Sequence, residues 1–174
     1  MKIAVDLDGT LAEIHTVFLK ELEKREGISH RFEDLETYYF DEAPFSVEKF
    51  HKLARYNWKN REISLTDPSL PRELNRISKN HRVDIVTARG DVEEKFLRNW
   101  LENKGIKFDS FIVDRIKTNL DYDVLIDDSP KYIGKGMKVF LYDRPYNRNA
   151  ETGKNSWRVK NFSEIRDRIK QKLV

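Results

Sequence analysis

The sequence contains no cysteine, and this absence excludes two kinds of stabilising site. Without a thiol, the 174 residues can form neither a disulfide framework nor a metal site built from thiolates. A chain of this length can nevertheless bury a full hydrophobic core. The length suits one domain, which can carry a small inserted subdomain.

Long apolar runs are also missing. No stretch approaches the roughly 18 apolar residues that a membrane-spanning helix needs. Asp6 interrupts the first apolar run too early for a signal peptide. We therefore expect a cytoplasmic protein that has no membrane partner.

A strong excess of charge of one sign is absent as well. The 33 lysine and arginine residues nearly balance the 30 aspartate and glutamate residues, which leaves a formal net charge of +3. Domains that bind nucleic-acid polymers usually carry a strongly basic surface, so the balance argues against such a partner. Apolar residues make up 39% and charged residues 36%, which indicates a globular protein with a highly charged surface.

Five short apolar runs have the composition of buried strands. Each is rich in Val, Ile, Leu or Phe and is continuously apolar, as parallel strands covered on both faces are. Helical patterns lie between several of them. The sequence therefore predicts a Rossmann-like, doubly wound α/β core with a five-stranded, mainly parallel sheet. The expected strands are residues 2–6, 82–87, 110–114, 123–127 and 137–142.

Four segments have the pattern of amphipathic helices. Asp91 opens one of them with a capping-box pattern, and Gly105 follows its end as a C-terminal cap. Pro71 lies in the first turn of another, where proline is tolerated. Leu173 continues the apolar side of the last one. The expected helices are residues 13–25, 70–79, 91–104 and 163–173.

The connection between the first two expected strands is unusually long. Residues 7–81 separate them, whereas a simple crossover needs about a dozen residues. Part of this segment is rich in aromatic residues. We interpret residues 14–66 as an inserted, mostly helical cap, and residues 1–13 and 67–174 as the core. An insertion after the first strand would cover the carboxyl edge of the sheet and can close over a ligand.

Two carboxylates follow the first expected strand, in the segment Asp6-Leu7-Asp8-Gly9-Thr10. In an open α/β sheet, ligands bind outside the carboxyl ends of the strands. Two carboxylates two residues apart at such an end suit a hard cation such as Mg²⁺, and Gly9 lets the backbone turn sharply. The alternative is a polar turn that binds no ligand.

Further polar side chains follow two other expected strands. Thr87 ends one strand, and its hydroxyl and the amides after it face the same edge as Asp6; the alternative is a β-branched residue that merely finishes a strand. Asp127 and Asp128 end another strand, where adjacent acids are costly unless a cation or a base neutralises them. A metal site is therefore favoured over a polar loop. Lys117 lies ten residues before Asp127, and a lone lysine there is usually a solvated surface group.

These four pieces occur in one order, and together they resemble the phosphatase branch of the haloacid dehalogenase superfamily. The resemblance covers the whole core. It implies that Asp6 is the nucleophile and that Asp8 is the general acid and base. It also implies a phosphate site and a Mg²⁺ site. The implied phosphate-binding residues are Thr87 and Lys117, and the implied metal residues are Asp6, Asp8, Asp128 and, behind them, Asp127. Ala88 and Arg89, which follow Thr87, are further candidates for contact with the phosphate; the alternative for Arg89 is a surface salt bridge.

A closer resemblance is to the 5′(3′)-deoxyribonucleotidase-like family. Two positions depart from the pattern of that family, because Tyr122 stands where relatives often carry Gly and Ala88 where they tend to carry Pro. The resemblance implies a small phosphorylated substrate, with nucleoside monophosphates favoured, and a monomer or homodimer. The residues that carry it are 123–130, the spacing after Lys117, residues 145–147 and residues 157–165.

The expected activity is Mg²⁺-dependent hydrolysis of phosphomonoesters through an aspartyl-phosphate. A dehalogenase needs no acid at Asp8, although a phosphomutase keeps the same pair of aspartates. The alternatives are a phosphatase for another small metabolite, such as a sugar phosphate, and a phosphate-binding module without catalysis. In the insertion, Phe18, Tyr39 and Phe45 are candidates for contact with a base or a sugar; the alternative is that they form the insertion's own core.

Overall fold

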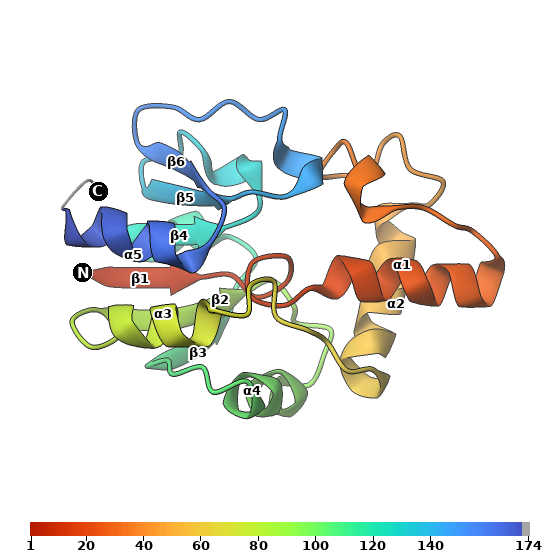
Figure 1. Ribbon diagram of the computed structural model, residues 1–174, viewed down its shortest axis with the longest axis horizontal. Coiled ribbons are helices and arrows are strands. Elements are labelled where there is room, and N and C mark those ends of the chain that lie inside the picture. The colour runs from red at the N-terminus through yellow and green to blue at the C-terminus, as the bar shows by residue number, and fades with distance from the viewer. Residues whose placement is uncertain (172–174) are drawn as a thin grey trace.

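The computed structural model describes residues 1–171 of the chain. Its centre is a six-stranded sheet with the order β3-β2-β1-β4-β5-β6, in which every pair of neighbouring strands is parallel (Figure 1). The doubly wound α/β fold expected from the sequence is confirmed. The strands are β1 (Lys2–Val5), β2 (Arg82–Thr87), β3 (Ser110–Val113), β4 (Val124–Asp127), β5 (Lys138–Tyr142) and β6 (Ser156–Val159).

The five expected strands are all present within one residue of their expected ends, but the sheet has a sixth. Strand β6 pairs with β5 at the edge of the sheet, from Val139 opposite Ser156 to Tyr142 opposite Val159. Its two central side chains are only half-buried. An edge strand of this kind lacks the continuous apolar run on which the prediction depended.

Five α-helices accompany the sheet within the described part of the chain. Three of the four expected helices start at other residues than expected, two of them by a single residue. The helix expected from Asp91 begins at Glu94, because the carboxylate of Asp91 accepts a hydrogen bond from Arg89 (3.4 Å) and caps no helix. The last helix is capped by Asn161, whose side chain accepts from the N–H of Glu164 (3.0 Å). The helices are α1 (Ile14–Glu26), α2 (Val47–Asn60), α3 (Leu70–Ile77), α4 (Glu94–Asn103) and α5 (Phe162–Lys170).

Leu173, expected on the apolar side of the last helix, lies outside the described residues. Within residues 1–171, no helix is long and apolar enough to cross a membrane.

The two faces of the sheet are covered differently. Ile3 and Val5 of β1 belong to a large apolar cluster that also contains the buried side chains of α3, α4 and α5. Ala4 points to the other face and joins a small cluster with Tyr132, which lies in a 3₁₀ turn (Pro130–Tyr132). This alternation explains the continuous apolar character of the central strands, because both faces are covered.

The segment between β1 and β2 forms α1, α2 and α3, and α1 and α2 project beyond the sheet (Figure 1). The entry and exit of this projecting part lie side by side. The N–H of Glu13 donates to Ser64 (2.9 Å), and the N–H of Thr66 donates to Leu11 (3.0 Å). These bonds lie close to the boundaries expected for an inserted cap, whose division from the core stays a prediction.

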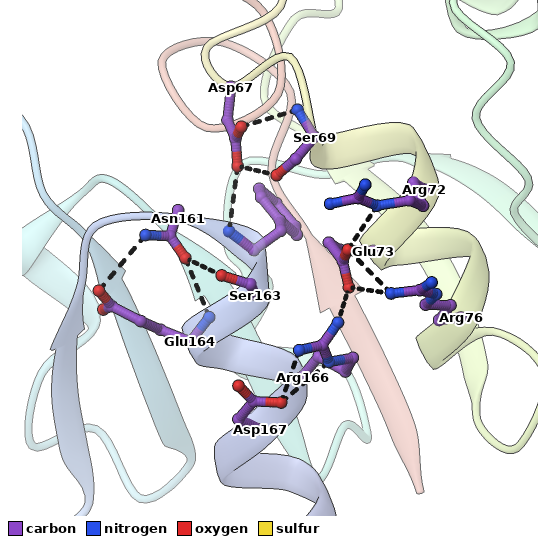
Figure 2. A network of polar contacts seen from close by, with 11 residues as sticks. Asp67, Ser69, Arg72, Glu73, Arg76, Asn161, Ser163, Glu164, Arg166 and Asp167 are labelled. Carbon is purple, nitrogen blue, oxygen red and sulfur yellow. Dashed lines mark hydrogen bonds and ion pairs between the residues drawn. The ribbon is translucent and has the colours of Figure 1, made fainter.

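A buried carboxylate joins α3 to α5, as Figure 2 shows. The side chain of Glu73 is 1% exposed and accepts hydrogen bonds from Arg72 (2.7 Å), Arg76 (3.1 Å) and Arg166 of α5. Burial alone would raise the pKa of Glu73, but the hydrogen bond from Arg72 and the charges of Arg166 and Arg76 lower it. The ion pairs therefore favour the ionised carboxylate in the folded state.

Asp67 makes a second connection between the same helices (Figure 2). Its carboxylate accepts from the N–H and the hydroxyl of Ser69 (2.8 and 2.9 Å), which precedes α3. It also accepts from the N–H of Phe162 (3.3 Å), the first residue of α5. The starts of α3 and α5 are thus fixed to one side chain.

We expect Glu73→Gln to lower the free energy of unfolding by about 1–3 kcal/mol at pH 7, because it removes the negative charge that pairs with Arg72, Arg76 and Arg166 at a buried position. The pKa of Glu73 is lower in the folded state than its ordinary value of 4.5. Its stabilisation is therefore complete above pH 4.5 and is lost as the pH falls through the folded-state pKa. The difference in the free energy of unfolding between Glu73→Gln and the unmodified protein should narrow below pH 4.5, as measured by chemical denaturation.

The control is Glu62→Gln, at a side chain that is 88% exposed. A difference that stays constant down to pH 3 would contradict this account.

Candidate active site

Three carboxylates from two neighbouring strands meet at the carboxyl edge of the sheet. Asp6 follows β1, and its N–H continues the ladder to Ile126 of β4 (2.9 Å). Asp127 ends β4, and Asp128 follows it. Among the described residues, Asp6, Asp127 and Asp128 each offer an oxygen within 4.8 Å of the others. The structure thus brings together acids that are about 120 residues apart in the sequence because β1 and β4 are adjacent in the sheet.

Lys117 lies between two of these carboxylates. It begins a 3₁₀ turn (Lys117–Asn119) between β3 and β4, and it is buried. Its ammonium group donates to Asp6 and to Asp127, the latter over 2.6 Å. Burial alone would lower the pKa of Lys117, but the charges of Asp127 and Asp6 raise it, so the side chain stays protonated. The ten-residue spacing between Lys117 and Asp127 in the sequence thus separates the two partners of an ion pair.

The three acids retain more negative charge than Lys117 neutralises. Burial raises the pKa of Asp6 well above its ordinary value, and the charge of Lys117 only partly opposes this. Burial, followed by the charge of Asp127, raises the pKa of Asp128 to about 7. A bound cation would stabilise the ionised carboxylates and would therefore lower both raised pKa values. Buried carboxylate oxygens are ligands that Mg²⁺ accepts, so the donor set fits that ion.

Asp128 accepts hydrogen bonds from residues that follow β1 and β5. Its two carboxylate oxygens accept from the hydroxyls of Thr10 (3.1 Å) and Tyr146 (2.7 Å), and its carbonyl accepts from Asn147 (2.8 Å). Gly9 has a φ of +83°, and a Cβ there would lie 2.6 Å from both Asp128 Oδ2 and the Tyr146 hydroxyl. The turn after Asp6 therefore needs glycine for its conformation and for space.

Asp8 has a separate set of partners. Its Oδ1 accepts from the indole N–H of Trp58 (2.9 Å), and its Oδ2 accepts from the guanidinium of Arg89, with 2.6 Å to Nε. Arg89 is itself buried, and its charge also faces Asp91. The Thr87 hydroxyl accepts from the N–H of Arg89 (3.1 Å). Arg89, expected from the sequence at a phosphate site, is thus an ion-pair partner of Asp8 in this structure.

A cavity of about 470 Å³ opens beside these groups and is lined by both the core and the projecting segment. Asp6, Asp8, Asp128 and the segment from Thr87 to Arg89 line it from the core, whereas Lys117 and Asp127 lie behind the surface. The projecting segment contributes a mostly aromatic wall. Its members are His15, Tyr38, Tyr39, Phe40, Val47, Phe50 and His51.

The three aromatic residues singled out in the sequence have different surroundings. Tyr39 lines the cavity and is 58% exposed. Phe18 and Phe45 are buried and pack edge to face with ring centroids 4.8 Å apart, away from the cavity lining. Their placement offers no support for contact with a substrate.

His15 stacks on Phe50, with ring centroids 4.9 Å apart. Burial and the charges of Arg144 and Arg89 lower the pKa of His15, so the imidazole is neutral at pH 7.

Two contacts in the site were not expected from the sequence. The hydrogen bond from Trp58 to Asp8 joins residues 50 positions apart, and that from Tyr146 to Asp128 joins residues 18 apart. The segment Pro145-Tyr146-Asn147 is part of the resemblance to the 5′(3′)-deoxyribonucleotidase-like family, which is a signal that Tyr146 has a role. For Trp58 the only signal was its place in an aromatic-rich stretch.

Comparison with models of known protein families gives a match along the whole chain. The model of a family described as "5′ nucleotidase, deoxy (Pyrimidine), cytosolic type C protein" matches residues 1–174. A comparison with curated proteins gives no significant match.

Two solved structures illustrate the similarity of the fold. A haloacid dehalogenase-superfamily hydrolase from Ehrlichia chaffeensis has a TM-score of 0.54 and 18% identity, over 99% of this chain and 97% of that one. A putative β-phosphoglucomutase from Thermotoga maritima has a TM-score of 0.55 and 16% identity, over 98% of this chain and 99% of that one. At these identities the likeness shows a shared fold alone.

We expect Gly9→Ala to destabilise the protein more than Gly27→Ala does. Both glycines have positive φ values, +83° and +69°, but a Cβ at Gly27 would meet nothing within 4 Å. Gly27→Ala should therefore cost about 1–2 kcal/mol for conformation alone, and Gly9→Ala about 1–3 kcal/mol more because Asp128 and Tyr146 must move. Denaturant titration measures both. Equal losses would show that the close approach at Gly9 is unimportant.

Proposed function

The chain belongs to the family of cytosolic type C 5′-nucleotidases and has the fold of haloacid dehalogenase-superfamily hydrolases, and from this premise we propose that it is a phosphatase that hydrolyses phosphomonoesters through an aspartyl-phosphate on Asp6. The observation that carries the proposal is the pairing of Asp6, which lines the cavity, with the buried Lys117 behind it. We further propose that residues 14–66 act as a cap over this cavity.

Asp6 is the nucleophile in this proposal. Its carboxylate reaches the cavity, and the charge of Lys117 favours the ionised form against the effect of burial on its pKa. An oxygen of Asp6 attacks phosphorus, the bond from phosphorus to the ester oxygen breaks, and the phosphoryl group is left on the enzyme. Water then attacks that phosphoryl group, which releases inorganic phosphate and frees Asp6.

Asp6 and Asp128 would hold Mg²⁺, together with the backbone carbonyl of Asp8. When bound, the ion would supply the positive charge that lets an anionic nucleophile approach an anionic phosphate. Asp127 fits a supporting place behind it, because one of its oxygens accepts from Lys117 and the other from the N–H of Ser129 (2.8 Å).

Asp8 is the proton donor and acceptor in this proposal. It lines the same cavity as Asp6 but has its own partners. It gives a proton to the departing ester oxygen and later takes one from the attacking water. The phosphate oxygens would contact Thr87, Ala88 and Arg89 in the lining, with the charge of Lys117 behind them.

Nucleoside monophosphates are the favoured substrates. A cavity of about 470 Å³ lies within the usual range of small-molecule sites. Its aromatic wall, with Tyr38, Tyr39 and Phe40, offers flat apolar surfaces against which a base can pack. A small sugar phosphate would leave much of that wall without contact.

Asp6→Asn should lower phosphate release by about 10⁴-fold or more, because the amide is a poor nucleophile. Asp121→Asn, at a side chain that is 95% exposed, is the matched control and should keep full activity. Release of inorganic phosphate from the best substrate measures both. Turnover by Asp6→Asn at the rate of the unmodified protein would overturn the role of Asp6.

A panel of phosphate esters tests the substrate class. With Mg²⁺ present, we expect nucleoside monophosphates to have higher kcat/KM values than sugar phosphates. A chelator should abolish the activity, and added Mg²⁺ should restore it, because the carboxylate cluster needs a cation. Higher values for sugar phosphates would change the substrate class but keep the phosphatase. Absence of hydrolysis of every ester by the folded, Mg²⁺-loaded protein would indicate a phosphate-binding module.

A further inference from the structure

The carboxylate of Asp8 is held from two sides by groups of different origin. Arg89 follows β2 in the core and contacts only Oδ2, through both Nε and Nη2. Trp58 comes from α2 and contacts Oδ1, with its indole nitrogen 2.9 Å away. Contact with a single oxygen leaves the carboxylate free to turn about its own bond. The contact with Trp58 on the second oxygen fixes the plane of the group.

Trp58 reaches Asp8 from behind the cavity. Asp8 belongs to the cavity lining, whereas Trp58 lies outside it and is 5% exposed. The indole N–H is a donor only, so it can neither supply a base nor accept a proton. The hydrogen bond to Asp8 connects Trp58 to a side chain that lines the cavity.

Trp58 is itself firmly placed. Its ring meets that of Trp100 of α4 edge to face, with centroids 5.5 Å apart and an interplanar angle of 83°. Trp100 in turn donates its indole N–H to the carbonyl of Ile63 (2.8 Å). Next to Trp58, Lys59 pairs with Glu93 before α4 (3.3 Å). The C-terminal end of α2 is thus docked on the core, and it presents a fixed donor to Asp8.

We propose that Trp58 is a positioning residue for Asp8, which holds the carboxyl group in the orientation needed for proton transfer to the departing ester oxygen. This inference rests on the proposed function of Asp8. Its consequence is that the segment between β1 and β2 takes part in the chemistry as well as covering the site. Trp58 would act through Asp8, because it donates to Asp8 and lies outside the cavity lining.

The test compares two esters that differ in their need for an acid. A nucleoside 5′-monophosphate has an alkoxide leaving group that must be protonated, whereas p-nitrophenyl phosphate releases a stable anion. Trp58→Phe keeps an aromatic ring beside Trp100 and removes the N–H. We expect it to lower kcat/KM for the nucleotide about 10- to 100-fold more than kcat/KM for the aryl ester. The ratio of the two values does not depend on the fraction of folded enzyme, so partial unfolding cannot imitate the result.

Two further variants make the outcome decisive. Trp157→Phe replaces an indole of β6 that packs against Phe140, outside the cavity lining, and its ratio should equal that of the unmodified protein. Trp58→His, which can supply a ring N–H, should recover part of the ratio. The proposal is overturned if Trp58→Phe lowers both values equally or leaves both unchanged, or if Trp157→Phe has the same effect on the ratio.

Asp8→Asn separates failure of this inference from failure of the proposed function. It should show the largest selective loss on the nucleotide. If Asp8→Asn lowers kcat/KM for both esters equally, the acid role of Asp8 fails, and the positioning role of Trp58 fails with it. If Asp8→Asn is selective and Trp58→Phe is not, only the positioning role fails.

Discussion

The ammonium group of Lys117 makes it possible for two buried carboxylates to face each other across neighbouring strands. Asp6 and Asp127 come from the ends of β1 and β4, and burial opposes ionisation of such groups. Lys117 donates to both, and their charges keep it protonated in turn. Because β4 lies beside β1 in the sheet, the aspartate that follows β1 and the aspartate that ends β4 meet at the same edge. The remaining acid, Asp128, is left facing the cavity and is held by Tyr146 and Thr10.

Asp6 and Asp8 are only two residues apart, yet they lie in different electrostatic surroundings. Asp6 contacts Lys117 within the acidic cluster, whereas Asp8 contacts Arg89 and the neutral donor of Trp58. Two carboxylates in one site can take different tasks when their environments differ in this way. The separation depends on the turn at Gly9, where a side chain would collide with Asp128.

The sequence predicted those parts of the fold that depend on local pattern. Buried central strands such as β1 and β4 are continuously apolar, and the acids at their ends could be placed at one edge because the strands were expected to be parallel. Strand β6 was missed because its short sequence, with two half-buried central side chains, has no continuous apolar run, and the start of α4 was misplaced because Asp91 faces Arg89. The contact of Trp58 with Asp8 depends on how α2 packs on α4, which no local pattern specifies.

The aromatic residues of the segment between β1 and β2 show why composition alone does not identify a binding wall. Phe18 and Phe45 fill the interior between its elements, whereas Tyr39 and the stacked pair of His15 and Phe50 line the cavity. His15 also packs against Tyr146, with ring centroids 4.6 Å apart, and Tyr146 holds Asp128. The segment is thus joined to Asp128 through His15 and to Asp8 through Trp58. Any movement of this segment that opened the cavity would therefore change the surroundings of both acids, so that access to the site and the readiness of its acids are linked by the same contacts.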